Sequence, residues 1–353
     1  MKNFMRSLGF GSSRSSRSSR SSSSNWNEQQ ADNDEQTPAS SPSTSPSQTS
    51  SAFSGLPERP RKKAIALEES LNSSNNIPYE MRMYAEAALS AAKHGSSEAI
   101  TKADVENKYY LAHAYNERFP ELHLSCHDSA QSFFSEFMTS EKQAWRSIVR
   151  LSPSSMHHAA IDVRFKDGKR TMLVIEPALA YGMKDGEIKV MAGYETLGKN
   201  VQNCLGENGD MAVIQLGAQK SLFDCVIFSL NMALCAYQKD SVFDNLHDCL
   251  RRNVRCFSSG ERKSILHKNI EFIEGDKFLP PIFYKHSHSR GVVGEFISNQ
   301  PEYAHKNVST GRTNPSEDLS ERVENFRVRR GDLSYSMSIE ASRLRKIRKT
   351  IES

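Results

Sequence analysis

The sequence predicts a mixed fold of the α/β or α+β class, and three observations support this. Helix-type spacing of apolar residues over 79–138 gives way to β-branched runs between residues 144 and 176. Helix-type patterns then return between residues 198 and 254. An Asp-Gly pair, Asp167-Gly168, separates two of the β-branched runs and is a strong hairpin signal. Helices before and after a sheet indicate a layered core in which helices cover the sheet.

The N-terminal stretch does not have the composition of a folded domain. It contains GSSRSSRSSRSSSS and TPASSPSTSPSQTSS, which hold too little apolar surface to offset the entropy lost on ordering. We therefore predict a disordered Ser-rich secretion or targeting segment at 1–58 and a folded part at 59–353. An acid-poor, Ser/Arg-rich start is typical of organelle transit peptides, and it equally suits the unfolded leader of a type III secreted effector.

The elements of the folded part follow from their periodicity. Helices are predicted at residues 79–94, 102–117, 130–138, 198–205, 221–237 and 242–254. Strands are predicted at residues 144–151, 159–165, 170–176 and 211–216. The polar stretch from residue 307 is predicted to be a loop that leads into a final basic helix at 341–352.

The charge of the chain argues against nucleic acid as a partner. The formal net charge is +4, and residues 1–27 hold five basic residues and no acid, so the rest of the chain is nearly neutral. A nucleic-acid-binding domain normally carries a basic face over the whole domain. We therefore predict no nucleic-acid partner.

Cysteine usage and the lengths of apolar runs exclude two further classes. The six cysteines form no C-x-x-C pair, which favours reduced thiols over a disulfide framework or a structural zinc site. We therefore predict no bound metal. The longest apolar run, at 226–237, is shorter than the ~20 residues that span a bilayer, so no transmembrane segment is predicted.

Cys225 is the candidate nucleophile. Ser221 and Asp224 have the spacing of a capping box just ahead of an apolar helix, which places Cys225 in the first helical turn. The positive end of the helix dipole favours the thiolate there. The alternative is a small buried residue in an apolar helix, which is the interpretation we give to Cys235 in the same helix.

The base and the group that orients it follow from the predicted hairpin. A turn at Asp167-Gly168 places His157 and Glu176 on the same face of the sheet, one diagonal apart and within reach of each other. His158 then points to the opposite face, with Asp162. The alternative for two adjacent histidines at a strand start is exposure at the surface. The pleat favours His157 with Glu176 as the interacting pair.

These residues lie in three short motifs. The motifs are H-x-x-x-x-D from His157, I-E-P-A from Ile175, and Q-x-x-x-x-D-C-x-I-F-S from Gln219. The combined pattern resembles the YopJ/AvrRxv family of type III secreted effector acetyltransferases over roughly residues 75–300. One departure is Val226, where the family often has glycine.

The resemblance implies a catalytic core at about 130–280, related to the cysteine proteases that process ubiquitin-like proteins. It also implies a helical regulatory lobe, formed by the flanking helices and residues 281–353. The expected protein is a bacterial virulence effector, secreted by a type III system into the host cell. It would transfer acetyl from acetyl-CoA to Ser, Thr or Lys of host signalling or defence proteins such as kinases, with inositol hexakisphosphate as activator.

The resemblance also assigns roles to residues. The catalytic residues would be His157, Glu176 and Cys225, and Gln219 would donate to the oxyanion together with backbone amides. The coenzyme A site is expected at His157, Lys220 and Ser221, and autoacetylation at Lys285. A polyphosphate activator needs converging cations, for which the candidates are Lys285, His286, Arg290, Arg329, Arg330, Arg343, Arg345, Lys346, Arg348 and Lys349. The alternative for the final run of basic residues is a solvated helix face.

Two other functions fit the same sequence. A cysteine protease acting on ubiquitin-like conjugates would use the same catalytic residues in the same order. A protein without enzymatic activity that binds and inhibits a host kinase would not need Cys225.

Overall fold

The computed structural model describes residues 52–74, 76–184, 187–191, 193–206, 209–252, 254, 264–309 and 316–353. Of the segment predicted to be disordered at 1–58, residues 1–51 therefore lie outside the described part of the chain. Packed structure starts before the predicted boundary at residue 58. Phe53 is almost fully buried, and the Lys93 ammonium lies 4.7 Å from the centre of its ring.

The centre of the described part is a seven-stranded mixed sheet, which confirms the predicted α/β class. In sheet order the strands are β1 (Leu124–His127), β2 (Ala144–Arg150), β3 (His158–Lys166), β4 (Lys169–Glu176), β7 (Gly209–Gln215), β9 (Ile270–Glu274) and β8 (Ser264–His267). Strands β2, β3 and β4 are antiparallel, whereas β4, β7 and β9 run parallel. The sequence predicted β2, β3, β4 and β7, and it missed the short strands at both edges.

The β3–β4 hairpin has the register that the sequence predicted. Its turn residues, Asp167 and Gly168, have φ values of 53° and 75°, and a two-residue turn with both φ values positive matches the twist of the flanking strands. Ala160 pairs with Ile175 in the ladder. Residues of β3 with odd numbers therefore share a face of the sheet with the even-numbered Glu176.

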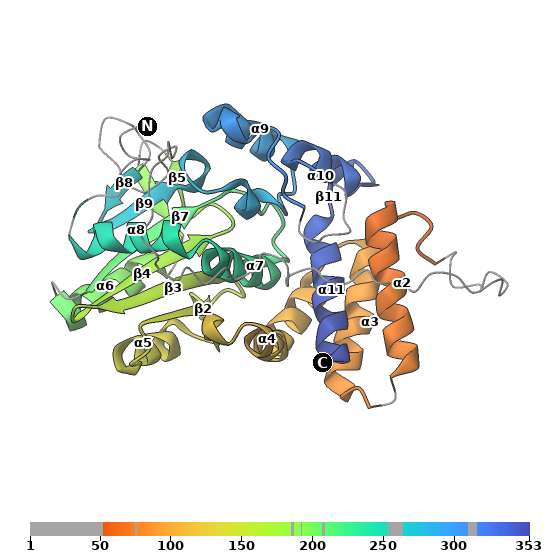
Figure 1. Ribbon diagram of the computed structural model, residues 1–353, viewed down its shortest axis with the longest axis horizontal. Helices are drawn as coiled ribbons and strands as arrows, with labels where there is room; N and C mark the ends of the chain where they lie inside the picture. The colour runs from red at the N-terminus through yellow and green to blue at the C-terminus, as the bar shows by residue number, and fades with distance from the viewer. Residues whose placement is uncertain are drawn as a thin grey trace, which may run out of the picture.

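Helices cover both faces of the sheet (Figure 1). Helices α7 (Cys225–Gln238) and α8 (Asp240–Arg251) cover one face, and α5 (Ala130–Thr139) and α6 (Tyr194–Leu205) cover the other. Alternate residues of each strand enter the two cores: Ala160 packs with the α7 side, and Ile161 with the α5 and α6 side. This is the layered arrangement that the sequence predicted.

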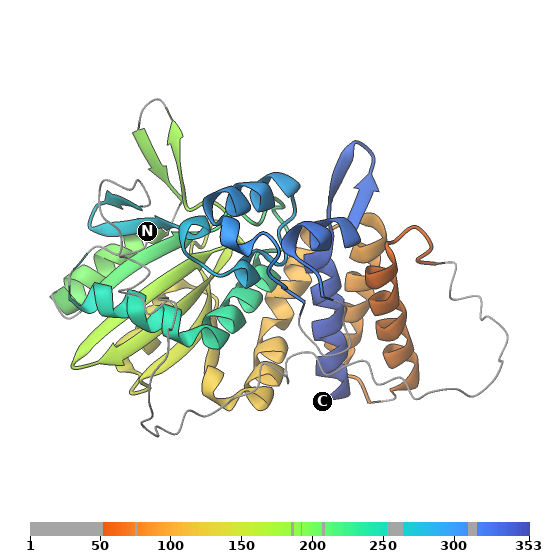
Figure 2. The ribbon, with the colours of Figure 1, turned by 45° about the horizontal axis from the view of Figure 1, so that its top comes forward.

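A second group of helices packs beside the sheet and forms what we call the helical lobe. It consists of α2 (Glu58–Ser73), α3 (Tyr79–His94), α4 (Glu98–Arg118) and α11 (Ser338–Glu352). Although α2 and α11 come from opposite ends of the described chain, they lie side by side (Figures 1 and 2). The N-terminal and C-terminal parts of the chain therefore build one unit.

Shorter elements complete the fold. They are η3 (Pro120–Leu122), β5 (Tyr181–Lys184), β6 (Glu187–Val190), η6 (Gly275–Lys277), η7 (Pro281–Tyr284), α9 (Arg290–Asn299), η8 (Pro301–Tyr303), α10 (Leu319–Asn325), β10 (Arg327–Arg330) and β11 (Leu333–Ser336). The loop predicted from residue 307 is thus wrong over 319–336, where α10 and the β10–β11 hairpin form. The hairpin projects from the top of the lobe in Figure 2.

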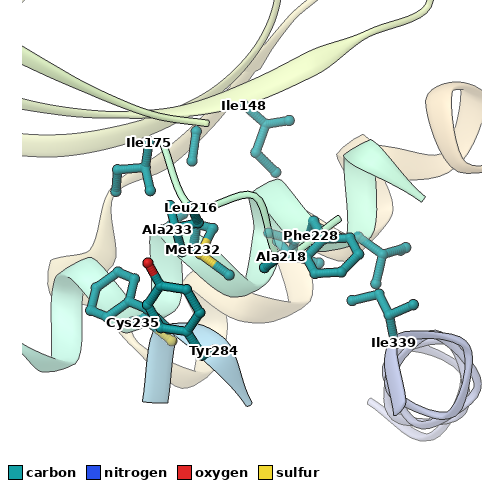
Figure 3. Packing of buried hydrophobic residues seen from close by; sticks show 14 of the residues in the cluster. Ile148, Ile175, Leu216, Ala218, Phe228, Met232, Ala233, Cys235, Tyr284 and Ile339 are labelled. Atoms are coloured by element: carbon teal, nitrogen blue, oxygen red, sulfur yellow. The ribbon is translucent and has the colours of Figure 1, made fainter. Parts of the chain in front are cut away.

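The helix that begins at Cys225 is buried on nearly all sides. Figure 3 shows α7 between Ile148 and Ile175 of the sheet on one side and Tyr284 and Ile339 on the other. It therefore lies between the sheet, η7 and the helical lobe. Among the residues that the structure describes, no helix is both long and apolar enough to span a membrane.

Candidate active site

The structure brings His157 and Glu176 together at one end of the sheet. His157 directly precedes β3, and Glu176 is the last residue of β4. Since these two strands are antiparallel, both residues lie at the same end of the hairpin. The His157 Nε2–H donates to Glu176 Oε2 at 2.7 Å. Glu176 is fully buried and the His157 side chain is 18% exposed. The imidazole is thus held from within the core and reaches the surface at one end.

The carboxylate of Glu176 has partners on both oxygens. Its Oε1 accepts the backbone N–H of Ala178 at 2.8 Å, and its Oε2 also accepts the hydroxyl of Tyr194, the first residue of α6. Burial and the charge of Glu176 hold the pKa of Tyr194 well above its usual value, so this phenol stays a donor. Tyr194 thus helps to hold the Glu176 carboxylate, a contact that no sequence pattern indicated.

The surroundings of His157 favour its protonated form. Burial of the ring opposes the charge, but the Glu176 carboxylate and hydrogen bonds to Cys225 and Glu176 outweigh it and raise the pKa of His157 to about 10. These contacts therefore favour the imidazolium form of His157. An imidazolium beside a sulfur stabilises negative charge on that sulfur.

Cys225 is the first residue of α7 and lies against His157. The sulfur influences the His157 ring, and because His157 Nε2 is directed at Glu176, the Nδ1 atom is the ring nitrogen left for the sulfur. The sulfur also lies 3.5 Å from the carbonyl oxygen of Met156 and is 2% exposed. Glu176, His157 and Cys225 thus form a continuous chain of contacts.

The predicted capping box at the start of α7 is wrong. The helix begins at Cys225, and Asp224 occupies the N-cap position without capping it. Ser221 instead donates its hydroxyl to Asp224, whose carboxylate also accepts from Arg343 at 2.7 Å and from Ser96 at 2.9 Å. Burial would raise the pKa of Asp224, but the charge of Arg343 is the largest of the influences that lower it below its usual value.

The loop before Cys225 carries the other expected active-site residues. Parallel pairing of β4 with β7 places this loop beside the residues that follow Glu176, and the Gln219 backbone N–H donates to Pro177 O at 2.9 Å. The Gln219 side chain is buried, and its Nε2 donates to Ser221 O at 2.7 Å. Lys220 is exposed and Ser221 is half-buried. The structure therefore groups Gln219, Lys220 and Ser221 immediately ahead of Cys225.

His158 lies outside this chain of contacts, on the opposite face of the sheet. It is fully buried, and its Nδ1–H donates to Met156 O at 2.7 Å. Burial lowers the pKa of His158 to about 4, so the ring is neutral at physiological pH. Asp162, on the same face, is paired with Arg146, Arg164 and His247 and serves the packing of the core.

The cations expected to bind the activator fall into two groups. Lys346 is buried and Lys285 is half-buried, and they lie near Arg345 and Arg322, respectively. Desolvation together with these like charges holds the pKa of each lysine well below its usual value. The second group lies on other elements. It comprises Arg290, which is exposed and paired with Glu324, Arg329, which is exposed on β10, and Arg330, which contacts Tyr335, Glu340 and Ala92 O.

The basic residues of the final helix do not form the solvated face that was the alternative interpretation. Arg343 and Lys346 are 1% and 2% exposed. Lys346 donates to Tyr115 Oη at 2.6 Å and to Asn231 Oδ1 at 2.9 Å. Within the described ranges, no group of three or more His, Cys, Asp and Glu side chains is arranged to hold a metal ion.

Comparisons with known sequences agree on one family. Residues 81–349 match the family described as YopJ Serine/Threonine acetyltransferase. A serine/threonine-protein acetyltransferase of Sinorhizobium fredii is 37% identical over 169 residues, a match that spans 47% of this chain and only 62% of that relative. The acetyltransferase HopZ1a of Pseudomonas syringae pv. syringae is 25% identical over 82% of this chain and 87% of its own. YopJ of Yersinia pestis is 22% identical over 69% and 80%.

Two solved structures share the fold. HopZ1a in complex with IP6 and CoA superposes with a TM-score of 0.73 at 22% identity, covering 84% of this chain and 98% of that one. AvrA with IP6 and CoA gives a TM-score of 0.60 at 24% identity, covering 77% and 97%. These likenesses confirm the predicted α/β fold class.

Proposed function

Because this chain belongs to the YopJ serine/threonine acetyltransferase family, we propose that it transfers acetyl from acetyl-CoA to protein side chains through an acyl-enzyme on Cys225. The observation that carries the proposal is the chain of contacts from Glu176 through His157 to Cys225. A nucleophile, a base and a group that orients the base are the parts that covalent acyl transfer requires.

In the first step the Cys225 sulfur attacks the thioester carbonyl of acetyl-CoA. A bond forms between that sulfur and the carbonyl carbon, and the bond from the carbon to the coenzyme A sulfur breaks. The imidazolium of His157 gives its proton to the leaving thiolate. Glu176 keeps the ring in place during the transfer, since both of its oxygens are already hydrogen-bonded.

In the second step the acceptor hydroxyl or amine attacks the acetyl carbon. The neutral His157 takes the proton of the acceptor, and the bond between the carbon and the Cys225 sulfur breaks. The sulfur leaves as a thiolate beside the renewed imidazolium, so the resting state returns. Negative charge on the carbonyl oxygen needs donors, which we assign to Gln219 and to backbone amides at the start of α7.

We place the coenzyme A site at His157, Lys220 and Ser221. The exposure of Lys220 next to the nucleophile supports this, because an ammonium there can pair with a phosphate. The Ser221 hydroxyl is engaged by Asp224, so its contribution would come through the loop backbone.

We further propose that inositol hexakisphosphate is the activator. HopZ1a and AvrA have both been solved with IP6. In this chain desolvation and, after it, the charges of Arg322 and Arg345 lower the pKa values of Lys285 and Lys346, and a polyanion bound there would favour their charged forms. Lys285 would also be the autoacetylated residue.

This assignment is tested by thermal shift with inositol hexakisphosphate. The gain in melting temperature should shrink in Lys285→Gln and Lys346→Gln, whereas Arg290→Gln should keep it, since Arg290 is already paired with Glu324. An unchanged gain in both lysine variants would move the activator site to the other basic group.

The setting follows from the same proposal. We place the protein among type III secreted effectors that act on host signalling or defence proteins, such as kinases. The Ser-rich composition of the segment predicted at 1–58 and the family membership support this.

The decisive experiment uses two cysteines of one helix. Cys225→Ala should lose transfer from radiolabelled acetyl-CoA, and Cys235→Ala, a matched change in the buried part of α7, should keep it. A protease would show no label in either protein but would cleave conjugates. A pure binder would keep its cellular effect in Cys225→Ala.

A further inference from the structure

The two residues before Cys225 are held by the helical lobe. The Thr101 hydroxyl, in the first turns of α4, donates to the carbonyl oxygen of Phe223 at 3.0 Å. The Ser96 hydroxyl, in the α3–α4 connection, donates to Asp224 Oδ1 at 2.9 Å. The lobe therefore contacts both the main chain and the side chain of the segment that leads into α7.

Arg343 of α11 supplies the charge in this junction. It is 1% exposed, and its Nη2 donates to Asp224 Oδ1 at 2.7 Å and to Asp104 Oδ2 at 2.8 Å. Its Nε adds a bond to Asp104 Oδ1 at 2.9 Å. One guanidinium thus joins α11, α4 and the residue next to the nucleophile.

The other side of Asp224 faces His288. The Nε2 of His288 lies 3.8 Å from Asp224 Oδ2, and its Nδ1 accepts the backbone N–H of Lys220 at 3.0 Å. The His288 backbone N–H donates to Ala218 O at 3.1 Å. The loop that carries Gln219 and Lys220 is therefore fixed to the same junction.

This junction replaces a helix cap. An Asp at the N-cap position normally accepts a backbone N–H of its own helix and stabilises it, but Asp224 does not. Its carboxylate is directed instead at partners from distant parts of the chain. A buried ion pair often adds little to the stability of a protein, but it can hold its partners in one arrangement. We therefore interpret the Arg343–Asp224 contact as one that fixes the position of the segment before α7.

We propose that Arg343 is a positioning residue for Cys225: acting through Asp224, it fixes the first turn of α7 where the sulfur meets His157, and so couples the nucleophile to the helical lobe. The inference deepens the proposed function and rests on Cys225 as its nucleophile. Removing the guanidinium would leave the Asp224 carboxylate unbalanced beside the sulfur, which disfavours a thiolate there.

The test measures alkylation of Cys225 by iodoacetamide between pH 6 and 9, followed by peptide mass spectrometry and without acetyl-CoA. Cys204 is exposed and serves as the internal reference, and the buried Cys235 reports general opening of α7. Arg343→Gln should slow alkylation of Cys225 at pH 7 about tenfold or more, as expected for losing a hydrogen bond to a charged group. Arg343→Lys should be intermediate.

Two further variants separate positioning from stability. Asp224→Asn in the Arg343→Gln background removes the stranded charge and should recover part of the lost rate. Arg164→Gln is the matched control, because Arg164 is also a buried arginine bound to aspartates, Asp162 and Asp244, but has no contact with Asp224. It should lower the melting temperature and leave the alkylation profile of Cys225 unchanged.

The inference is overturned if Arg343→Gln and Arg343→Lys lower the melting temperature while the alkylation profile overlays that of the unaltered protein. A parallel rise in labelling of Cys235 would also overturn it, since this would mean loosening of the whole helix. Failure of the proposed function appears separately, as absent acetyl transfer in the unaltered protein. With transfer intact, Arg343→Gln should reduce kcat about tenfold with little change in KM for acetyl-CoA.

Discussion

Replacing Glu176 by Gln is the sharpest test of the catalytic arrangement. Gln has nearly the same volume and removes the charge that faces His157. If its oxygen stays with His157 and Tyr194, its NH2 group faces the Ala178 N–H and that one hydrogen bond is lost. The change therefore removes the counter-ion of the imidazolium while keeping the side chain's volume in the core.

The size of the effect follows from the pKa of His157. The site raises this pKa from 6.5 to about 10 in spite of burial, which corresponds to about 5 kcal/mol in favour of the imidazolium. The charge of Glu176 is the largest of the contributions that oppose burial. If its loss removes half of that energy, the proton should be held roughly 50- to 100-fold less tightly. We expect acetyl transfer to fall by about 10²-fold or more.

Two measurements check this expectation. Alkylation of Cys225 should change little with pH between 6 and 9 in the unaltered protein and should rise with pH in Glu176→Gln. The melting temperature gives an independent reading. Since the pKa of His157 is raised on folding, its stabilisation is complete below pH 6.5 and is lost as pH rises towards 10. That loss should be about half as large in Glu176→Gln.

A matched control is Glu271→Gln, which alters another buried carboxylate of the same sheet. It should leave the alkylation profile unchanged. If Glu176→Gln also gave the profile of the unaltered protein, the thiolate would not depend on the Glu176–His157 pair, and the reasoning from the His157 pKa would be refuted.

Three further outcomes are expected. Tyr194→Phe should lower kcat about tenfold with a near-normal melting temperature, because it removes one donor to a charged carboxylate and keeps the ring. His157→Ala should abolish transfer, whereas His158→Ala should reduce it less than tenfold and should remove the loss of stability between pH 6.5 and 4 that a buried neutral histidine causes. A chain starting at residue 52 should match the full-length melting temperature, and one starting at residue 60 should melt several degrees lower because it lacks the buried Phe53.

Each of these outcomes has a contrary result. Unchanged kcat in Tyr194→Phe would mean that Ala178 and His157 alone hold Glu176. Equal losses in the two histidine variants would assign a catalytic share to His158. Equal melting temperatures for the two shortened chains would show that the Phe53 contact adds nothing to stability.

The pairing of His157 with Glu176 could be predicted because its determinants are local. An Asp-Gly turn fixes the register of two adjacent strands, and the pleat then decides which side chains share a face. No long-range information is needed. The structure reproduces this register, with Ala160 opposite Ile175.

The start of α7 could not be predicted because its determinants are distant. Ser221 and Asp224 have the residue types and spacing of a capping box. The Asp224 carboxylate, however, accepts a hydrogen bond from Arg343 in the last helix and makes none with the backbone of α7. The burial of Arg343 in the final basic helix could not be predicted for the same reason, since its counter-charges, Asp104 and Asp224, come from other elements. By contrast, α10 carried a local signal, because Asp318 and Glu321 form a true capping box within the stretch predicted as loop.

Different parts of the fold hold the His157–Glu176 pair and the segment that precedes Cys225. His157 and Glu176 are held by β3, β4 and Tyr194 of α6, none of which belongs to the helical lobe. Cys225 follows a segment held by α4 and α11 of the helical lobe. A polyanion that orders the lobe can therefore change the placement of the sulfur while the His157–Glu176 pair stays as it is. We expect activation to raise the alkylation rate of Cys225. Because Glu176 is the largest of the influences that raise the pKa of His157, activation should alter the pH dependence of alkylation less than Glu176→Gln does.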